Sequence, residues 1–196
     1  MGRPGAGKTL FVVRFARWCG CRRLVLTRQG PAQGERRELD PTQAVAELVG
    51  GVSPTTRHLQ SVEVEYRKAK RVARVNLVDT VGLTDGIHPD PLLRLAMAET
   101  LAAALESSVL LHVLDGPDVA LRPQRLVEDS DVDAQIGRFG EARGRYAALV
   151  NKLDLPRGRE GLAAVRRLWP RRPVLGISAL QEVGFEGVRR FLQRTL

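Results

Sequence analysis

The first ten residues place glycines, a lysine and a threonine at a spacing that can hold phosphate. Gly2, Gly7, Lys8 and Thr9 fit the pattern G-x-x-x-x-G-K-[ST]. In such a loop the backbone N–H groups surround phosphate oxygens, the lysine reaches the outer phosphates and the hydroxyl reaches a magnesium ion. We therefore predict that this stretch binds a nucleotide through Gly2, Arg3, Pro4, Gly5, Ala6, Gly7, Lys8, Thr9 and Leu10.

A carboxylate and a glycine follow at the end of an apolar segment. Asp79 and Gly82 form D-x-x-G directly after the segment 73–79. A carboxylate in this position can hold Mg²⁺ through a water molecule, and the N–H of Gly82 can reach a terminal phosphate. We predict that both residues act on the phosphate end of the nucleotide.

Two further groups of residues lie at the ends of two later apolar segments. Asn151, Lys152 and Asp154 form N-K-x-D, and Ser178, Ala179 and Leu180 form S-A-L. In open α/β sheets, ligands bind in the crevice outside the carboxyl ends of the strands. We therefore expect all four groups to converge on one nucleotide site.

The elements that must position these residues alternate between apolar strands and amphipathic helices, which is typical of an α/β domain with a mostly parallel sheet. Helices are predicted at 7–20, 40–50, 90–107, 130–142, 158–169 and 185–196, with a loop at 30–38. Strands are predicted at 23–29, 108–116, 146–154 and 173–178. The segment 59–79 is predicted to form a hairpin whose second strand is central.

Length and composition favour one domain over residues 1–196. The chain is 43% hydrophobic and carries a formal net charge of +9. Cys19 and Cys21 alone would leave a structural zinc site incomplete, so we expect reduced thiols. Arg14 and Arg17 interrupt the apolar stretch near the amino terminus, so neither membrane insertion nor export is indicated, and we expect a cytoplasmic protein.

The positive charge is densest near the carboxyl end. An RNA-facing or ribosome-facing patch and an ordinary solvated surface are both compatible with a charge cluster of this kind. The residues concerned are Arg166, Arg167, Arg171, Arg172, Arg189, Arg190 and Arg194.

The order of the four motifs resembles the translation-factor-related class of P-loop GTPases, and its Era-like branch in particular. The resemblance covers nearly the whole chain and implies a Ras-like three-layer α/β/α P-loop NTPase fold with one antiparallel hairpin strand. It implies that Asn151, Lys152 and Asp154 read guanine, that Ser178 positions its loop, and that the N–H of Ala179 faces the guanine carbonyl oxygen.

The same resemblance implies a switch that cycles between Mg·GTP and GDP. Thr56, with Thr55 as second choice, would close on Mg²⁺ beside Thr9 and Asp79 when GTP is bound. It implies catalytic roles for Lys8, Thr56 and Gly82. His88, in the loop after D-x-x-G, could orient a water molecule or cap the loop.

Two departures from the pattern indicate slow hydrolysis that a partner stimulates. Leu83 follows D-x-x-G where Ras-like enzymes place a water-orienting glutamine. Gly5 stands where many Era-like loops have an asparagine associated with a potassium ion. A nucleotide-gated binding module without hydrolysis is therefore the alternative. An ATP-dependent kinase or motor is disfavoured by N-K-x-D and S-A-L.

One expectation concerns a strand that the printed sequence lacks. In the fold that the resemblance implies, an apolar strand feeds the phosphate loop and lies between the strands at 71–79 and 108–115. Only Met1 precedes Gly2. Because unpaired buried backbone groups each cost about 1–3 kcal/mol, we expect a strand of about five or six residues ahead of Gly2 in the working protein. In this chain we expect a gap, a collapsed pairing or a foreign strand there.

Overall fold

The computed structural model describes residues 1–21, 24–28, 36–40, 42–45, 60–68 and 71–196. Its helices are α1 (Lys8–Trp18), α3 (Pro91–Glu106), α4 (Gly116–Leu121), α5 (Val132–Arg143), α6 (Gly158–Leu168) and α7 (Phe185–Thr195), with a 3₁₀ helix η1 at Pro123–Val127 and a helical segment at 42–45. Its strands are β1 (Leu24–Arg28), β2 (Arg36–Leu39), β3 (Gln60–Lys68), β4 (Arg71–Asp79), β5 (Leu110–Asp115), β6 (Tyr146–Asn151) and β7 (Val174–Gly176).

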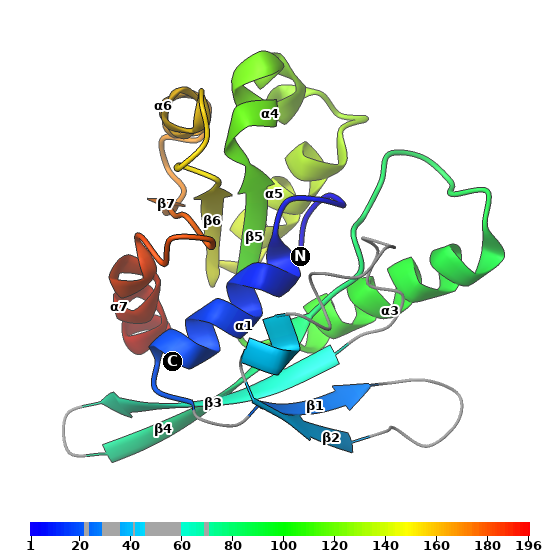
Figure 1. The fold of residues 1–196 in the computed structure, drawn as a ribbon. Helices are drawn as coiled ribbons and strands as arrows, with labels where there is room; N and C mark the ends of the chain where they lie inside the picture. The colour runs from blue at the N-terminus through cyan, green and yellow to red at the C-terminus, as the bar shows by residue number, and fades with distance from the viewer. Residues whose placement is uncertain (22–23, 29–35, 41, 46–59, 69–70) are drawn as a thin grey trace.

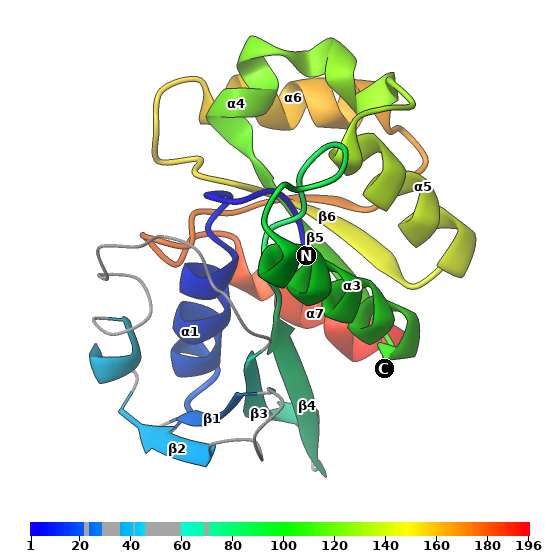
Figure 2. The same ribbon diagram turned by 90° about the vertical axis from the view of Figure 1, so that its right-hand side faces the viewer.

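The strands form two sheets. One contains β2, β1, β3 and β4 in that order with antiparallel pairing throughout, and the other contains β5, β6 and β7 with parallel pairing. Figure 2 shows the parallel sheet in the upper half of the molecule and the antiparallel sheet below it. The α/β fold class is thus confirmed, although the antiparallel part is larger than the single hairpin strand that we expected.

Helix α1 begins on the phosphate loop and packs through its aromatic side chains. Gly7 takes the left-handed conformation and is the N-cap residue. The rings of Phe11 and Phe15 stack with centroids 5.3 Å apart, and both meet the ring of Phe185 on α7 edge to face. Figure 1 shows α1 lying over the antiparallel sheet with α7 beside it. This packing fixes the helix end at which the loop sits.

Helix α3 starts where its sequence predicts. Asp90 accepts a hydrogen bond from the backbone N–H of Leu92 at 2.9 Å, and Pro91 occupies the first turn. Its apolar side chains are unusually open to solvent, since Leu92 is 77% and Leu105 61% exposed. The buried contacts of this helix come from small residues, Ala96 and Ala104 among them.

The structure differs from the predicted elements in three details. Residues 36–38 of the predicted loop belong to strand β2, which pairs with β1. Helix α4 and the 3₁₀ helix after it were not predicted. The predicted central strand, β4, pairs only with β3 among the described strands and so lies at a sheet edge, where Val78 is 40% exposed.

The expected gap lies between β4 and β5. A cavity of about 690 Å³ separates them, lined by β4, β5, α3, α1 and the end of α7. At its mouth the Met1 amino group donates to Leu111 O at 2.9 Å, and Val113 N–H donates to Met1 O at 2.8 Å. The sheet is therefore open between β4 and β5, with Met1 paired to β5.

Candidate nucleotide site

The phosphate loop runs from Met1, which is hydrogen-bonded to β5, to the start of α1. A Cβ atom at Gly2 would lie 2.2 Å from the carbonyl oxygen of Val113, so only glycine fits at this crossing. The Lys8 ammonium donates to the Arg3 carbonyl oxygen at 2.9 Å, across the loop. The amino end of α1 and a buried lysine thus face the same loop, which is the arrangement that binds phosphate.

Thr9 and Asp79 meet where the metal ion is expected. Thr9 Oγ1 donates to Asp79 Oδ2 at 2.7 Å. Among the described residues, no hydrogen-bond partner satisfies the buried Asp79 Oδ1. Burial raises the pKa of Asp79, while the Thr9 hydroxyl and the Lys8 charge oppose that change. A buried carboxylate oxygen lacking a donor, beside a hydroxyl, fits Mg²⁺ held directly or through water.

The D-x-x-G segment packs directly on the phosphate loop. The N–H of Leu83 donates to Gly2 O at 3.1 Å, and a Cβ atom at Gly82 would lie 2.5 Å from the Pro4 nitrogen. The Leu83 side chain is buried in the apolar cluster around β5 and β6. It therefore points into the core and cannot orient a water molecule.

Asn151 links the phosphate loop to the S-A-L loop. Its Nδ2 donates to Ala6 O at 2.9 Å, and its Oδ1 accepts from the N–H of Ala179 at 2.9 Å. Both bonds are buried, because β6 ends at the meeting point of the two loops. The N–H of Ala179 is thereby engaged within the protein, whereas we expected it to face guanine.

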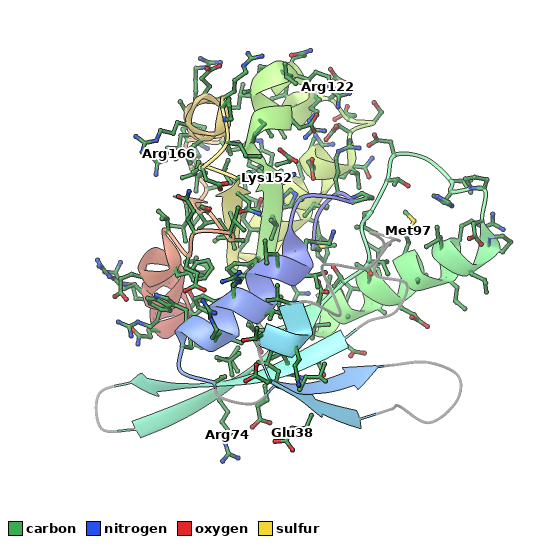
Figure 3. The ribbon with its side chains drawn as sticks, in the orientation of Figure 1. Glu38, Arg74, Met97, Arg122, Lys152 and Arg166 are labelled. Atoms are coloured by element: carbon green, nitrogen blue, oxygen red, sulfur yellow. The ribbon has the colours of Figure 1, made fainter. Side chains whose placement is uncertain are left out.

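Asp154 and Lys152 are held by partners on neighbouring loops. The Ser178 hydroxyl donates to Asp154 Oδ1 at 2.5 Å. The positioning role of Ser178 in nucleotide binding stays a prediction. Lys152 has a left-handed backbone with a φ of 67°, and its ammonium pairs with Asp115 Oδ2 at 2.5 Å. Figure 3 shows Lys152 beyond the upper end of β6. Leu180, next in the S-A-L loop, is 57% exposed at the rim.

Residues 41–152 match the family model described as 50S ribosome-binding GTPase, which is more than half of the chain. The chain belongs to this GTPase family. No curated protein matches it. The cytosolic domain of FeoB from L. pneumophila has a similar fold, with a TM-score of 0.54 at 13% identity over 98% of this chain and 66% of that chain. A putative nucleolar GTP-binding protein 1 from Plasmodium falciparum aligns with a TM-score of 0.48 at 14% identity, over 100% of this chain and 82% of that chain.

The family membership places this chain among the P-loop GTPases, and the chain spans less than two thirds of the length of the FeoB cytosolic domain. The Era-like branch within that class stays a prediction. Of the helices that the structure describes, none has the length and apolar character needed to span a bilayer.

In this GTPase, Arg3 has a role that its motif does not predict. Its guanidinium contacts Asp85 Oδ1 at 2.7 Å, Asp131 Oδ2 at 2.6 Å and Asp133 Oδ2 at 3.1 Å. Asp85 also accepts from the N–H of Val132, the first residue of α5. Arg3 therefore ties the phosphate loop to the segment after D-x-x-G and to α5.

His112 extends the same network into the core of the GTPase. Its ring nitrogens lie 2.9 Å from Asp133 Oδ1 and 2.9 Å from the Tyr146 hydroxyl. Burial lowers the pKa of His112, and the hydrogen bond and charge of Asp133 oppose that effect. The histidine is thus a buried core residue with both ring nitrogens hydrogen-bonded.

His88 caps its own loop in the GTPase. Its Nδ1 accepts from the N–H of Asp90 at 3.1 Å, and its carbonyl oxygen accepts from Arg94. This contact is local to the start of α3 and leaves its catalytic role a prediction. Thr55, Thr56 and the residues beside them lie outside the described residues.

Some arginines of the basic cluster form ion pairs with glutamates on the surface of the GTPase. Arg172 contacts Glu141 at 2.7 Å and stacks over the Trp169 ring. Arg189 and Arg190 both contact Glu186. Figure 3 shows Arg166 on the outer side of α6.

Proposed function

We propose that the chain binds Mg·GTP and GDP at the loops described above and hydrolyses GTP slowly as a molecular switch. The observation that carries the proposal is the double hydrogen bond of Asn151, which joins the phosphate loop to the S-A-L loop. A ligand with a base at one end and phosphates at the other fits loops linked in this way. The family membership gives the base as guanine.

At the base end, Asp154 is the residue that selects guanine in this proposal. Its Oδ1 accepts from Ser178, which leaves Oδ2 to accept from the ring N–H and the 2-amino group of guanine. Adenine lacks that donor pair, so a carboxylate facing it would lose about 1–3 kcal/mol or more. The stem of Lys152 would lie over the ring.

At the phosphate end, Lys8 and Gly82 would contact the terminal phosphate, and Thr9, Thr56 and Asp79 would hold Mg²⁺ directly or through water. Bound Mg²⁺ neutralises phosphate charge and favours attack by water. The chain's own contribution is to fix the loop: the Gly2 carbonyl oxygen accepts from the N–H of Leu83, and the Arg3 carbonyl oxygen accepts from the Lys8 ammonium.

Slow turnover follows from the side chain after D-x-x-G. Leu83 is buried, and the ring of His88 accepts a local backbone N–H. A water-orienting group would therefore come from residues outside the described part of the chain or from a partner, as in GTPases stimulated by a second protein.

A single-turnover assay tests this proposal against a binding module without hydrolysis. The protein is preloaded with radiolabelled GTP and Mg²⁺, and the release of labelled phosphate is measured over hours. The Lys8→Ala variant is the control. We expect slow release by the unchanged chain and none by the variant. Tight GTP binding without release beyond the blank would support the binding module. Equal competition by ADP and GDP would overturn guanine selectivity.

Ribosome association is proposed on the family description together with the net charge of +9. Cosedimentation with bacterial 50S subunits, with GDP or a non-hydrolysable GTP analogue and at two salt concentrations, tests it. Binding that depends on the GTP analogue would support the proposal, and salt-sensitive binding independent of nucleotide would indicate only charge attraction.

A further inference from the structure

Asp115 ends strand β5 beside the N-K-x-D motif at the end of β6. The two strands are parallel, and their register places Asp115 directly opposite Asn151. Lys152 follows at once, and its ammonium reaches Asp115 Oδ2 at 2.5 Å. Figure 3 shows Lys152 at the upper end of the parallel strands. Because its partner lies on the neighbouring strand, the lysine stem runs from β6 toward β5 across the edge of the sheet where ligands bind in open α/β folds.

Helix α4 holds the Asp115 carboxylate in place. Asp115 is the N-cap residue of this helix, and its Oδ1 accepts from the N–H of Asp118 at 3.2 Å. Its other oxygen contacts Lys152. The side chains of Asp115 and Lys152 are 21% and 30% exposed, so the ion pair is partly shielded from water. One carboxylate therefore caps a helix and holds a cation at the same time, and each contact restricts its rotamer for the other.

The backbone around this ion pair is packed through two glycines. A Cβ atom at Gly116 would lie 2.7 Å from the carbonyl oxygen of Asn151, and one at Gly158 would lie 2.3 Å from that of Lys152. Figures 1 and 2 both show α4 and α6, the helices that begin at these glycines, side by side above the parallel strands. Lys152 also has a left-handed backbone with a φ of 67°, which a residue with a side chain seldom adopts. The packing thus sets where the lysine stem begins, and Asp115 sets where it ends.

We propose that Asp115 is a positioning residue for the guanine base: it holds the Lys152 ammonium so that the apolar stem of this lysine is extended along one face of the base site before nucleotide binds. The inference rests on the proposed function, in which Asp154 reads the edge of the base and the Lys152 stem covers its face. A lysine side chain loses rotamer freedom when a ligand immobilises it, and the ion pair removes that freedom beforehand. Asp115 thus contributes affinity for the base without choosing between bases.

Asp115→Asn tests the proposal, because asparagine caps a helix about as well as aspartate but lacks the charge that holds Lys152. We expect GDP affinity to fall about three- to tenfold in titration calorimetry, with little change in Tm. Pyrophosphate affinity should stay the same, since this ligand does not reach the base site. Xanthosine diphosphate binding by Asp154→Asn should weaken by the same factor when Asp115→Asn is added. Asp90→Asn, the same change at the N-cap of α3, is the matched control and should keep its GDP affinity.

A double-mutant cycle with Lys152→Met separates positioning of the stem from other effects of Asp115. Methionine keeps an unbranched apolar side chain and removes the ammonium. Asp115→Asn should therefore have no further effect on GDP affinity in the Lys152→Met chain. Equal losses in both backgrounds would mean that Asp115 acts without Lys152, which would overturn the proposal.

The remaining outcomes distinguish this inference from the proposed function. An unchanged GDP affinity in Asp115→Asn, in a chain that prefers GDP to ADP, would overturn the inference and leave the proposed function standing. A higher GDP affinity would mean that Asp115 draws the lysine away from the base, which also contradicts the inference. Equal binding of GDP and ADP by the unchanged chain, or binding of neither, would overturn the guanine selectivity on which both depend.

Discussion

Asp154 is held at one oxygen by Ser178, and this single contact makes a specificity test possible. In Asp154→Asn an amide donor replaces the second oxygen, so the site should favour xanthine nucleotides, whose extra carbonyl accepts it. We expect GDP affinity to fall at least tenfold and xanthosine diphosphate affinity to rise, measured by titration calorimetry. Asp115→Asn, whose carboxylate contacts Lys152 and the start of α4, is a control that should keep the preference for guanine over xanthine. An unchanged GDP affinity in Asp154→Asn would contradict the assignment.

Arg3 tests how far the phosphate loop depends on its acidic neighbours. Arg3→Ala leaves the buried Asp131 and Asp133 without this cation, and removing one partner of a buried ion pair costs about 3–5 kcal/mol. Asp85 is half exposed, so Asp85→Asn should cost less than about 1 kcal/mol. Urea unfolding of both variants measures the difference. Equal losses would mean that Arg3 acts only through Asp85.

Residues of this network could not be found from the sequence. Arg3 fills a position that the phosphate-loop pattern leaves open, and its partners are 82, 128 and 130 residues away. Asn151 and Asp154, by contrast, were predictable because their chemistry requires those residue types at that spacing. The bond between Asn151 and Ala179 was not predicted, since it depends on how two loops meet.

At the scale of elements, the segment after D-x-x-G is the part whose conformation should depend most on which nucleotide is bound. The N–H of Leu83 donates to the Gly2 carbonyl oxygen, and Asp85 accepts from Arg3 and from the N–H of Val132. A terminal phosphate would compete for the same loop, so we expect amide exchange over 80–90 and 51–58 to slow with a GTP analogue relative to GDP. Mass-spectrometric hydrogen exchange measures this, with α6 as an internal reference. Equal protection in both states would refute the switch.

Helices α1, α3, α5, α6 and α7 and the parallel strands were predicted because their caps and apolar runs are local signals. Asp90 before Pro91 marks the start of α3, and it does cap that helix. Strand β2 was missed because Arg36, Arg37 and Glu38 are charged, and this segment becomes a strand by pairing with β1. The edge position of β4 follows from the groove beside it, which the apolar pattern of β4 itself does not encode.

The molecule as a whole should become more stable as the pH rises from about 5 to 8. Burial lowers the pKa of the Met1 amino group from 8.0 to about 5, with the Lys8 charge acting in the same direction. Between these values the unfolded chain binds more protons, so the free energy of unfolding increases with pH, by up to about 4 kcal/mol in total. Above pH 8 this contribution is constant.

Thermal unfolding of the chain with a free Met1 amino group, checked by mass spectrometry, measures the effect against an amino-terminally acetylated control. The acetylated chain should lack the part of the pH dependence that lies between 5 and 8. Identical pH profiles of the two forms would show that the amino group is solvated in solution.

The two hydrogen bonds of the Asn151 amide have a consequence for ligands that represent only half of a nucleotide. Guanosine would occupy the loops after β6 and β7, and pyrophosphate the loop before α1, without touching one another. Because one amide side chain orders both loops, occupancy of either half should lower the entropy lost on filling the other. The two fragments would then bind with positive cooperativity, and Asn151→Ala would make their affinities independent.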